Sequence, residues 1–353
     1  MKFSSRFLII GLILLAGVML SACSGALPIH AWPGIAADAS AVYVAEGVGV
    51  FALNPNDGNI LWRYPEKAEN TRVFYAAPVL GPEGTLLVAD YEGGIASLDA
   101  KTGRERWLFK EAKGRFIASP VFVNSTILAA NSDHLLYALD LKGNLLWKYT
   151  SPEQLWVSPA SDGKAAYIVS VDQHIYAVNL KDGKQLWSAK LEGAAVGAPV
   201  VDKTPVIYVG TSIGNFYALN SETGAVIWKV KINKGVWSSP LFVDGTLYVG
   251  SGEGLVYALS SQDGTVKWKA RAGDSVIGSP ALTGNNLLVA VESGELVAMS
   301  LGGERQWGRP VNGKLYTAPV IEGQKVFVAA KGEKLVTAFD LSGTELWKID
   351  PPK

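Results

Sequence analysis

Histidine and carboxylate side chains are the groups of this 353-residue chain best suited to acid–base or metal chemistry. The histidines, His30, His134 and His174, fall in or beside predicted turns, without the spacing of a zinc site. No Ser-His-Asp order, phosphate loop or carboxylate pair rises above chance. A calcium site would need several oxygen ligands close together, and no dense Asp/Asn loop is present. The sequence therefore predicts no catalytic residue and no metal site, and the chain is not expected to be an enzyme.

Acidic residues recur in a series of predicted turns between two strands. Each lies five residues before an Ala or Ser in the strand that follows the turn. They are Glu92, Asp133, Asp172, Glu253 and Glu333. Asp and Glu suit solvated turns, which is the simplest interpretation. A partial ring of these acids could also attract a basic partner or a cation.

A second series of side chains lies three residues before each of eight prolines. The series is His30, Tyr75, Ile117, Trp156, Val196, Trp237, Ile277 and Tyr316. The aromatic members, Tyr75, Trp156, Trp237 and Tyr316, could form a rim that grips a partner segment or a sugar. Alternatively, they pack between neighbouring structural units. Exposure of Trp156 and Trp237 distinguishes these two interpretations.

One charged segment interrupts an otherwise regular chain. Trp62 and Pro78 are 16 positions apart, against 12 for most equivalent pairs, and the extra residues fall within 65–72. Its charged residues, Glu66, Lys67, Glu69 and Arg72, are candidates for a docking loop. A neutral insertion is the alternative.

The N-terminus has the pattern of an export signal. Lys2 and Arg6 precede an apolar run over 7–20, which is short for a membrane span, and small residues follow. The sequence Leu20-Ser21-Ala22-Cys23 resembles the lipobox of bacterial lipoproteins. That resemblance implies a signal peptide over 1–22, cleaved before a lipidated Cys23, and a tether over 23–31. An ordinary secretory signal with an incidental Cys is the alternative.

Composition narrows the classes of function. Lys+Arg and Asp+Glu both number 32, so the net charge is zero, which argues against a nucleic-acid-binding protein. Cys23 is the single cysteine, so no disulfide can form within the chain. The 38 glycines, 11 tryptophans and 13 tyrosines are typical of many short strands joined by tight turns.

A repeat of about 40 residues organises the chain from residue 32 to 353. Its clearest mark is a Trp that recurs at spacings of 45, 40, 40, 41, 40, 39 and 40 residues. These residues are Trp62, Trp107, Trp147, Trp187, Trp228, Trp268, Trp307 and Trp347. A period of this length indicates a propeller or a repeat array.

Each repeat contains the pattern of four short strands. Between Pro240 and Trp268, apolar runs over 240–243, 246–250, 255–259 and 265–269 are separated by turn residues such as Asp244-Gly245. Eight such units predict an all-β, eight-bladed β-propeller of four-stranded antiparallel blades over 32–353. The repeat Trp is expected to lie between neighbouring blades and seal them.

The residues Ala218, Asn220, Thr223, Gly224 and Trp228 resemble the tryptophan-docking repeat of pyrroloquinoline-quinone-type propellers. This resemblance covers nearly all of the chain after Cys23. One branch of that family, the quinoprotein dehydrogenases, is much longer and holds the quinone with Ca²⁺ beside a Cys-Cys disulfide. The other branch, the barrel-assembly lipoproteins of the BamB type, has a similar length, a lipobox and no cofactor.

These observations lead to one main hypothesis with two alternatives. We expect a monomeric, non-catalytic propeller scaffold without cofactor, lipid-anchored at the cell envelope, that binds envelope or membrane proteins. It would lie on the periplasmic face of the outer membrane in a Gram-negative cell, and otherwise on the outer face of the cytoplasmic membrane. The alternatives are an enzyme or sensor with a quinone or other small ligand in the funnel, and a carbohydrate- or peptide-binding lipoprotein.

Overall fold

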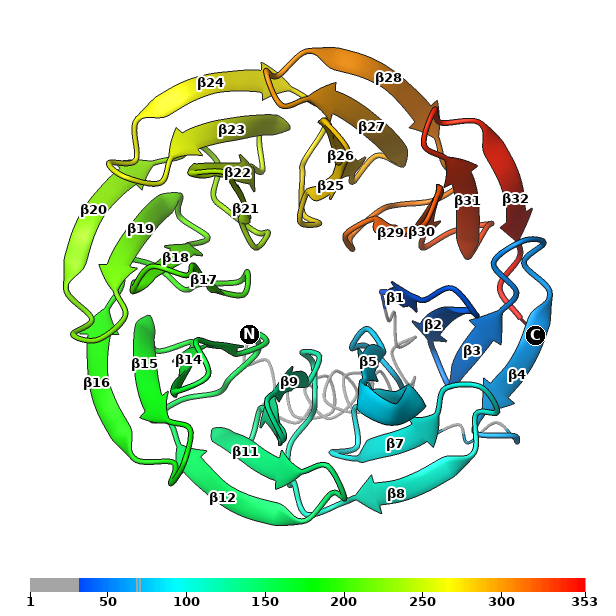
Figure 1. Ribbon diagram of the computed structural model, residues 1–353, viewed down its shortest axis with the longest axis horizontal. Coiled ribbons are helices and arrows are strands. Elements are labelled where there is room, and N and C mark those ends of the chain that lie inside the picture. The colour runs from blue at the N-terminus through cyan, green and yellow to red at the C-terminus, as the bar shows by residue number, and fades with distance from the viewer. Residues whose placement is uncertain (1–31, 68, 70, 353) are drawn as a thin grey trace, which may run out of the picture. The chain divides into compact units, whose positions relative to one another are not determined.

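The computed structural model describes residues 32–67, 69 and 71–352. They form eight blades around a central axis, and each blade is a four-stranded antiparallel sheet of consecutive strands (Figure 1). The predicted eight-bladed β-propeller is confirmed. The predicted signal segment and tether, with Cys23 and His30, lie outside the described residues. Within the described residues, no helix has the length and apolar character needed to cross a membrane.

The first four blades follow one another along the chain. Blade 2 also includes a short 3-10 helix, η1. Blade 1 contains β1 Gly34–Ala37, β2 Val42–Glu46, β3 Gly49–Leu53 and β4 Ile60–Tyr64; blade 2 contains β5 Val79–Gly81, η1 Pro82–Gly84, β6 Thr85–Ala89, β7 Ile95–Asp99 and β8 Glu105–Phe109. Blade 3 contains β9 Val121–Val123, β10 Thr126–Ala130, β11 Leu135–Asp140 and β12 Leu145–Thr150; blade 4 contains β13 Ala160–Ser161, β14 Ala165–Val169, β15 His174–Asn179 and β16 Gln185–Lys190.

The last four blades repeat this plan. Blade 5 contains β17 Val200–Val201, β18 Val206–Gly210, β19 Asn215–Asn220 and β20 Val226–Lys231; blade 6 contains β21 Leu241–Val243, β22 Thr246–Gly250, β23 Leu255–Ser260 and β24 Val266–Arg271. Blade 7 contains β25 Ala281–Thr283, β26 Asn286–Val291, β27 Glu295–Ser300 and β28 Arg305–Pro310; blade 8 contains β29 Val320–Glu322, β30 Lys325–Ala329, β31 Val336–Asp340 and β32 Glu345–Ile349.

Blade 6 shows why the chain folds locally in this way. Its first hairpin turns at Asp244 and Gly245, whose φ angles of 45° and 72° match a two-residue turn with both central residues left-handed. The middle strands β22 and β23 are almost entirely buried, because both of their faces pack against neighbouring blades. Pro240 precedes β21, where a missing backbone N–H is tolerated.

The repeat tryptophans form the seams between blades. The indole Nε1 of Trp228 in blade 5 donates to the carbonyl of Ser261 in blade 6 at 3.0 Å. The ring also lies on the turn glycine of that blade, since a Cβ built on Gly264 would be 2.6 Å from the indole. Opposite Trp228 in its own blade is the buried Ala218, which leaves room for the ring.

The same seam closes the ring. Trp347 of blade 8 donates to the carbonyl of Pro55 in blade 1 at 3.1 Å and lies against Gly58. Every blade is built from contiguous chain, so no strand is exchanged at the closure. Packing of blade 8 on blade 1 therefore holds the ring together.

The two ends of the ring differ in the segments they carry. One end, called here the crossing face, carries the turns between second and third strands and the segments that cross from one blade to the next. Lys113, in such a crossing, donates its backbone N–H to Asp133 of a second-to-third-strand turn at 2.9 Å, which places both on one face. The opposite face carries the other hairpin turns, including the glycines beneath the seam tryptophans.

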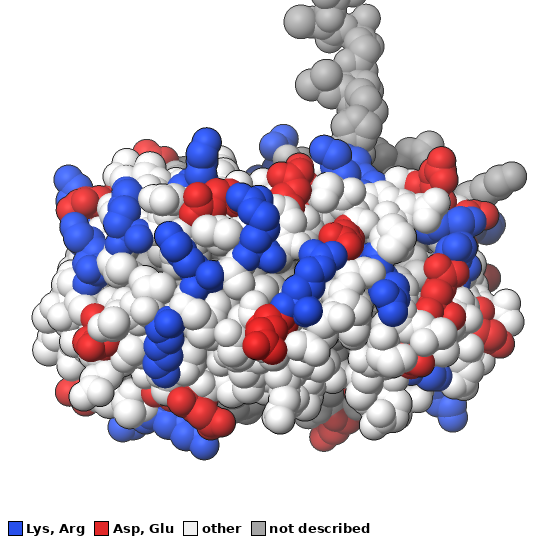
Figure 2. Space-filling model, turned by 90° about the horizontal axis from the view of Figure 1, so that it is seen from above, with Lys and Arg blue, Asp and Glu red and all other residues white. Residues whose placement is uncertain are grey.

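The outer wall of the ring is basic, although the chain as a whole has no net charge. It is formed by the fourth strand of each blade. Basic residues on these strands are Arg63, Arg106, Lys148, Lys190, Lys229, Lys231, Lys267, Lys269, Arg271, Arg305, Arg309 and Lys348, and the acids are Glu105 and Glu345. Figure 2 shows Lys and Arg side chains along the side of the ring. Charged side chains on open strand edges discourage pairing with a further strand.

Candidate functional site

A channel runs into the centre of the propeller and opens on the crossing face. Its cavity has a volume of about 350 Å³. The wall consists mainly of small residues at the start of each blade, such as Ala118, Gly197 and Ser279. They must be small because neighbouring inner strands approach closely: a Cβ on Gly197 would lie 2.5 Å from the backbone of Ser238.

Six of the eight side chains in the series before the prolines line this channel. They are Ile117, Trp156, Val196, Trp237, Ile277 and Tyr316, and we call this set the channel mouth. Trp156 is 48% exposed and Trp237 is 44% exposed. The two tryptophans therefore are not buried between blades, which was the alternative interpretation. Exposed aromatic side chains around a cavity are typical of binding surfaces.

A third exposed tryptophan lies beside the channel mouth. Trp32 is 51% exposed and stacks on Tyr316, with ring centroids 5.0 Å apart and an interplanar angle of 20°. Sequence reasoning missed this residue. Trp32 directly precedes Pro33, whereas the residue before each of the other seven prolines is Ala or Ser, so this exception was visible in the sequence.

Tyr75 is in the same series but does not line the channel. Its ring packs against Tyr91, with centroids 4.6 Å apart. Arg115 lies over Tyr91 at 4.3 Å and donates to its hydroxyl at 2.9 Å. Tyr75 thus belongs to a separate aromatic cluster on the crossing face.

The predicted acidic turns do lie on the crossing face, and tyrosines hold several of them in place. Tyr137 donates to Asp133 at 2.7 Å, and Tyr257 donates to Glu253 at 2.6 Å. Tyr176 makes the equivalent bond to Asp172 at 2.5 Å. Burial, followed by the bond to Glu253, raises the pKa of Tyr257 to about 12, so the tyrosine remains a donor at neutral pH.

The other acids of these turns are held differently. Glu333 accepts a long bond of 3.4 Å from Asn312, while Glu92 directs its backbone N–H to Asp90 at 3.1 Å. Glu46 at the end of β2 and Glu292 in the turn after β26 are the related acids of blades 1 and 7 and were missed, because they lie one residue earlier in the repeat. Burial raises the pKa of Glu46 to about 7.

The candidate docking loop divides into an exposed part and a buried part. Glu66, Lys67 and Glu69 are exposed. Arg72 is only 8% exposed and pairs with Asp90, which is 2% exposed, at 2.6 Å. Its guanidinium also donates to the hydroxyl of Tyr64 at 2.7 Å. Arg72 therefore anchors the loop to blade 2 and is not available to a partner, which corrects the expectation for this residue.

The equivalent turn of blade 5 carries an apolar residue in place of an acid. Ile213, which occupies the position of the acids, is 53% exposed. Its side chain rests on Gly193, where an added Cβ would approach it to 2.6 Å. The missing acid in the series was a signal in the sequence that our reasoning did not use.

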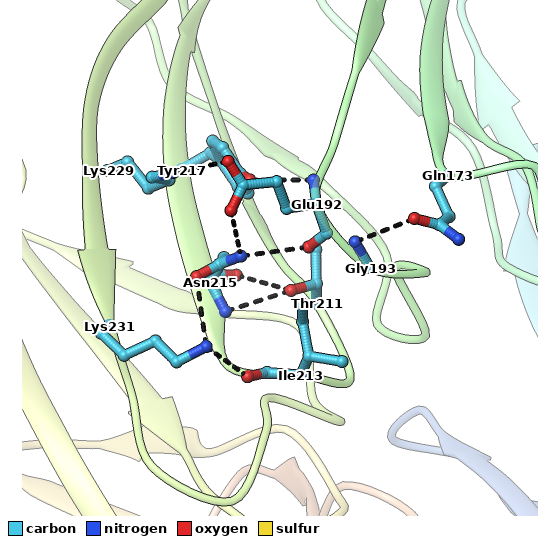
Figure 3. Close-up of polar contacts among 9 residues, drawn as sticks. All are labelled: Gln173, Glu192, Gly193, Thr211, Ile213, Asn215, Tyr217, Lys229 and Lys231. Carbon is cyan, nitrogen blue, oxygen red and sulfur yellow. Dashed lines mark hydrogen bonds and ion pairs between the residues drawn. The ribbon is translucent and has the colours of Figure 1, made fainter.

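A polar network fixes this turn of blade 5 (Figure 3). Lys231 donates to the carbonyl of Ile213 at 2.7 Å. The buried Asn215 donates to the carbonyl and to the carboxylate of Glu192, each at 3.2 Å. Lys229 completes the network with an ion pair to Glu192 at 2.9 Å. The turn is thus held from the outer strand and from the crossing segment together.

The described residues of the channel do not provide the ligands of a quinone cofactor. Pyrroloquinoline quinone carries carboxylates, which require cationic partners, and its Ca²⁺ requires several oxygen ligands. The side chains that line the channel in the described part of the chain include no Lys, Arg, Asp or Glu. No group of three or more His, Cys, Asp and Glu side chains suited to a metal occurs among residues 32–67, 69 and 71–352. The residues present therefore do not fit this cofactor.

Comparison with known proteins gives the family. The family model described as outer membrane protein assembly factor BamB matches residues 46–170, 143–212 and 171–347. The outer membrane protein assembly factor BamB of Nitrosomonas eutropha is 29% identical over 198 residues, which are 54% of this chain and 46% of that protein. A tetrathionate hydrolase of Acidithiobacillus ferrooxidans is 24% identical over 55% of this chain and 46% of that enzyme.

The chain thus spans about half the length of the curated relatives it matches. Among solved structures, BamB from Moraxella catarrhalis superposes with a TM-score of 0.71 at 19% identity, covering 87% of this chain and 93% of that chain. This likeness concerns the fold. Because the family model matches most of the chain, the protein belongs to the family of repeat propellers described as outer membrane protein assembly factor BamB.

Proposed function

We propose that this protein is a non-catalytic scaffold at the cell envelope whose crossing face binds a protein partner. The observation that carries the proposal is the exposure of Trp156 and Trp237 at the channel mouth. Large aromatic side chains that remain in water in an otherwise closed fold are typical anchors of protein interfaces. The names of the BamB relatives suggest a role in the assembly of outer membrane proteins.

The chemistry of the channel supports a binding function over catalysis. Among the described residues, the channel walls carry no Asp, Glu, His, Lys or Arg. Of the acids in the surrounding turns, Asp133 and Asp172 are each engaged by a tyrosine hydroxyl and a backbone N–H group. Acid–base catalysis needs a titratable group within reach of the substrate. We propose in addition that the protein acts as a monomer and is held at the membrane by a lipid on Cys23.

Site-specific crosslinking in cells tests the proposal. A photoreactive amino acid at position 156 should capture an envelope or membrane protein. The matched control places the same group at Leu186, which is 53% exposed on the outer wall and should not capture that protein. Failure to capture any envelope protein from position 156, with a folded and correctly located chain, would contradict the proposal.

A further inference from the structure

Five of the seams between blades contain a second aromatic ring beside the repeat tryptophan. The second strand of each of these blades carries a Tyr or Phe whose ring centroid lies 5.8 to 6.0 Å from the seam tryptophan of the same blade. These residues are Tyr43, Tyr167, Tyr208, Tyr248 and Phe327. In blades 4, 5 and 6 the tyrosine hydroxyl also donates, at 3.3 to 3.4 Å, to the carbonyl that accepts from the seam tryptophan.

Blade 2 lacks this second ring. Leu87 occupies the position of the tyrosine, and Ser97 occupies that of the small alanine opposite it. A cavity of about 380 Å³ lies between blades 2 and 3, at the end of the seam that belongs to the face opposite the channel mouth. Trp107, Phe122 and Leu141 contribute to its wall. The cavity therefore lies at the seam from which a phenol ring is missing.

The seam between blades 5 and 6 shows how such a wall holds a phenol. Tyr208 packs between Trp228 and Phe242, with ring centroids 6.0 Å apart in both pairs. Its ring is stacked on Phe242 at an interplanar angle of 11°, and its hydroxyl donates to the carbonyl of Ser261 at 3.4 Å. The phenol thus has two aromatic neighbours and one backbone acceptor.

All three neighbours have counterparts in the wall of the cavity. Trp107, Phe122 and Leu141 occupy the repeat positions of the two aromatic neighbours and the acceptor. The carbonyl of Leu141 accepts the Nε1–H of Trp107 at 3.0 Å. It receives no tyrosine hydroxyl, because Leu87 has none to offer. A carbonyl oxygen has two lone pairs, so this one can accept a further hydroxyl.

This combination of residues is found at one seam of the ring. Blades 3 and 7 also carry a leucine in place of the tyrosine, at Leu128 and Leu288. The residue that matches Phe122 is Ser161 in the first case and Ile321 in the second. Among the described residues, the blade 2–blade 3 seam alone keeps both aromatic walls without the ring between them.

Charges at the edge of the cavity balance one another. Arg106 donates to the carbonyl of Glu83 at 3.1 Å, which holds the turn over 82–84, and pairs with Asp99 at 2.8 Å. The side chains of Glu83 and Lys142, which also border the cavity, add one charge of each sign. This balance favours an uncharged ligand over an anion. An apolar wall with a small number of polar groups is typical of small-ligand sites.

We propose that the cavity between blades 2 and 3 binds a phenol ring. The ring packs against Trp107 and Phe122, and its hydroxyl donates to the carbonyl of Leu141, in the arrangement that Tyr208 has between blades 5 and 6. A free phenolic molecule and the tyrosine side chain of a polypeptide share this chemistry. The inference concerns the face opposite the channel mouth and does not depend on the proposed function.

p-Cresol, which is the tyrosine side chain as a free molecule, tests the inference. Its binding to the full chain in detergent is followed by ligand-detected NMR. Leu87→Tyr places the protein's own phenol in the cavity, so we expect binding at least tenfold weaker, with no fall in the melting temperature. Leu87→Met keeps the side-chain volume and should bind as the wild type does. Comparison of these proteins in the same detergent cancels uptake of the ligand by micelles.

Two further measurements sharpen the test. Toluene lacks the hydroxyl, so the binding that Leu87→Tyr removes should be about fivefold weaker for toluene than for p-cresol. Ser97→Leu narrows the same cavity from its floor and should also abolish binding, so the test does not depend on the folding of one variant. Equal binding of p-cresol to the wild type and to a folded filling variant would overturn the inference. Equal binding of p-cresol and toluene, or no saturable binding, would overturn it as well.

A pentapeptide with a central Tyr between Gly and Ser residues distinguishes the two sources of phenol. Displacement of p-cresol by this peptide, and not by the same peptide with Phe at its centre, would support the inference with a polypeptide side chain as ligand. Retention of p-cresol in the presence of the peptide would support it with a free phenolic molecule as ligand. The proposed function is tested separately, by crosslinking from position 156.

Discussion

Tryptophans of this propeller fall into two regions with opposite environments. Seam tryptophans such as Trp228 recur in all eight blades, pack on the turn glycine of the next blade and, in seven, donate to a backbone carbonyl of that blade. Tryptophans at the channel mouth occur in only some blades and are nearly half exposed. The tryptophans repeated in every blade therefore build the ring. The tryptophans of the channel mouth, which occur in only some blades, remain exposed and can contact another molecule.

Removal of a seam tryptophan should have the largest effect on stability. Trp228→Ala deletes the indole between blades 5 and 6, together with its bond to Ser261. Because the ring is half-buried, we expect a loss of about 3 kcal/mol in the free energy of unfolding, at the lower end of the range for a buried tryptophan. Thermal and denaturant melts measure this loss. A melt equal to that of the wild type would reject the seam assignment.

Substitution in the buried part of the 65–72 loop should lower stability, as substitution of a seam tryptophan does. Substitution in the exposed part should have little effect. Arg72→Ala leaves Asp90 as an unpaired buried carboxylate, so we expect a loss of about 3 kcal/mol in stability. Lys67→Ala, in the exposed part of the same loop, should change stability by less than about 0.5 kcal/mol. Equal effects of the two substitutions in urea unfolding would show that Arg72 does not anchor the loop.

The turn glycine beneath a seam tryptophan should be sensitive for two reasons. At Gly264 the φ angle is +74° and an added Cβ would meet Trp228 at 2.6 Å, whereas Gly245 has a φ of +72° and its Cβ would meet only Ser261 Oγ at 3.8 Å. Gly245→Ala should cost about 1 kcal/mol through backbone strain alone. Gly264→Ala should cost about 2 kcal/mol or more, as the indole must move. Identical melts of the two variants would mean that the glycine does not support the ring.

The effect of an acid of the crossing face on the free energy of unfolding should depend on whether a tyrosine donates a hydrogen bond to it. Glu46 has a buried Oε2 without a partner among the described residues, and burial raises its pKa to about 7. The folded state therefore binds this proton more tightly than the unfolded chain does. Stability from this group is full below the ordinary Glu pKa and falls as the pH rises toward 7.

Glu46→Gln consequently should raise stability by about 1 kcal/mol at pH 8 and leave it unchanged at pH 4, allowing for partial contact with water. Denaturant unfolding at the two pH values measures the difference. Glu253→Gln serves as the control, since Tyr257 already bonds to that carboxylate, and it should give no gain at pH 8. A gain from both substitutions would indicate general charge repulsion on this face.

The smallest effect on stability is expected at the channel mouth. Trp237→Ala removes a ring that is 44% exposed and bonds to no other blade among the described residues. We expect a change of less than about 1 kcal/mol in the free energy of unfolding. A loss as large as that of Trp228→Ala would place Trp237 among the structural residues and remove the contrast between the two regions.

The sequence predicted the ring well and the site only in part. The regular spacing of Pro and Trp, together with turn chemistry such as Asp244-Gly245, determined the blades, because each blade is a local structure. Which side chains line the channel depends on the path of each segment that crosses between blades. The spacing of Pro and Trp in the sequence does not determine that path. For this reason Tyr75 and Tyr316 looked alike in sequence, although only Tyr316 lines the channel.

Burial of polar groups was equally hard to predict. Arg72 lies in a charged segment and was expected on the surface, yet it meets Asp90 across 18 residues of sequence. Ser238 is one of several small residues before the prolines, and only the assembled inner strands show that its hydroxyl lacks a partner among the described residues. Whether a buried polar group finds a partner depends on how segments distant in sequence pack in the folded ring.

Partner capture by the double variant Trp156→Ala/Trp237→Ala tests the central claim most directly. Crosslinkers are placed at position 196 in the channel mouth, in the wild type and in the double variant, and both proteins are melted in parallel. We predict that the double variant melts within a few degrees of the wild type and no longer captures the envelope protein. Undiminished capture by a folded double variant would contradict the claim that the residues which break the repeat form the binding site.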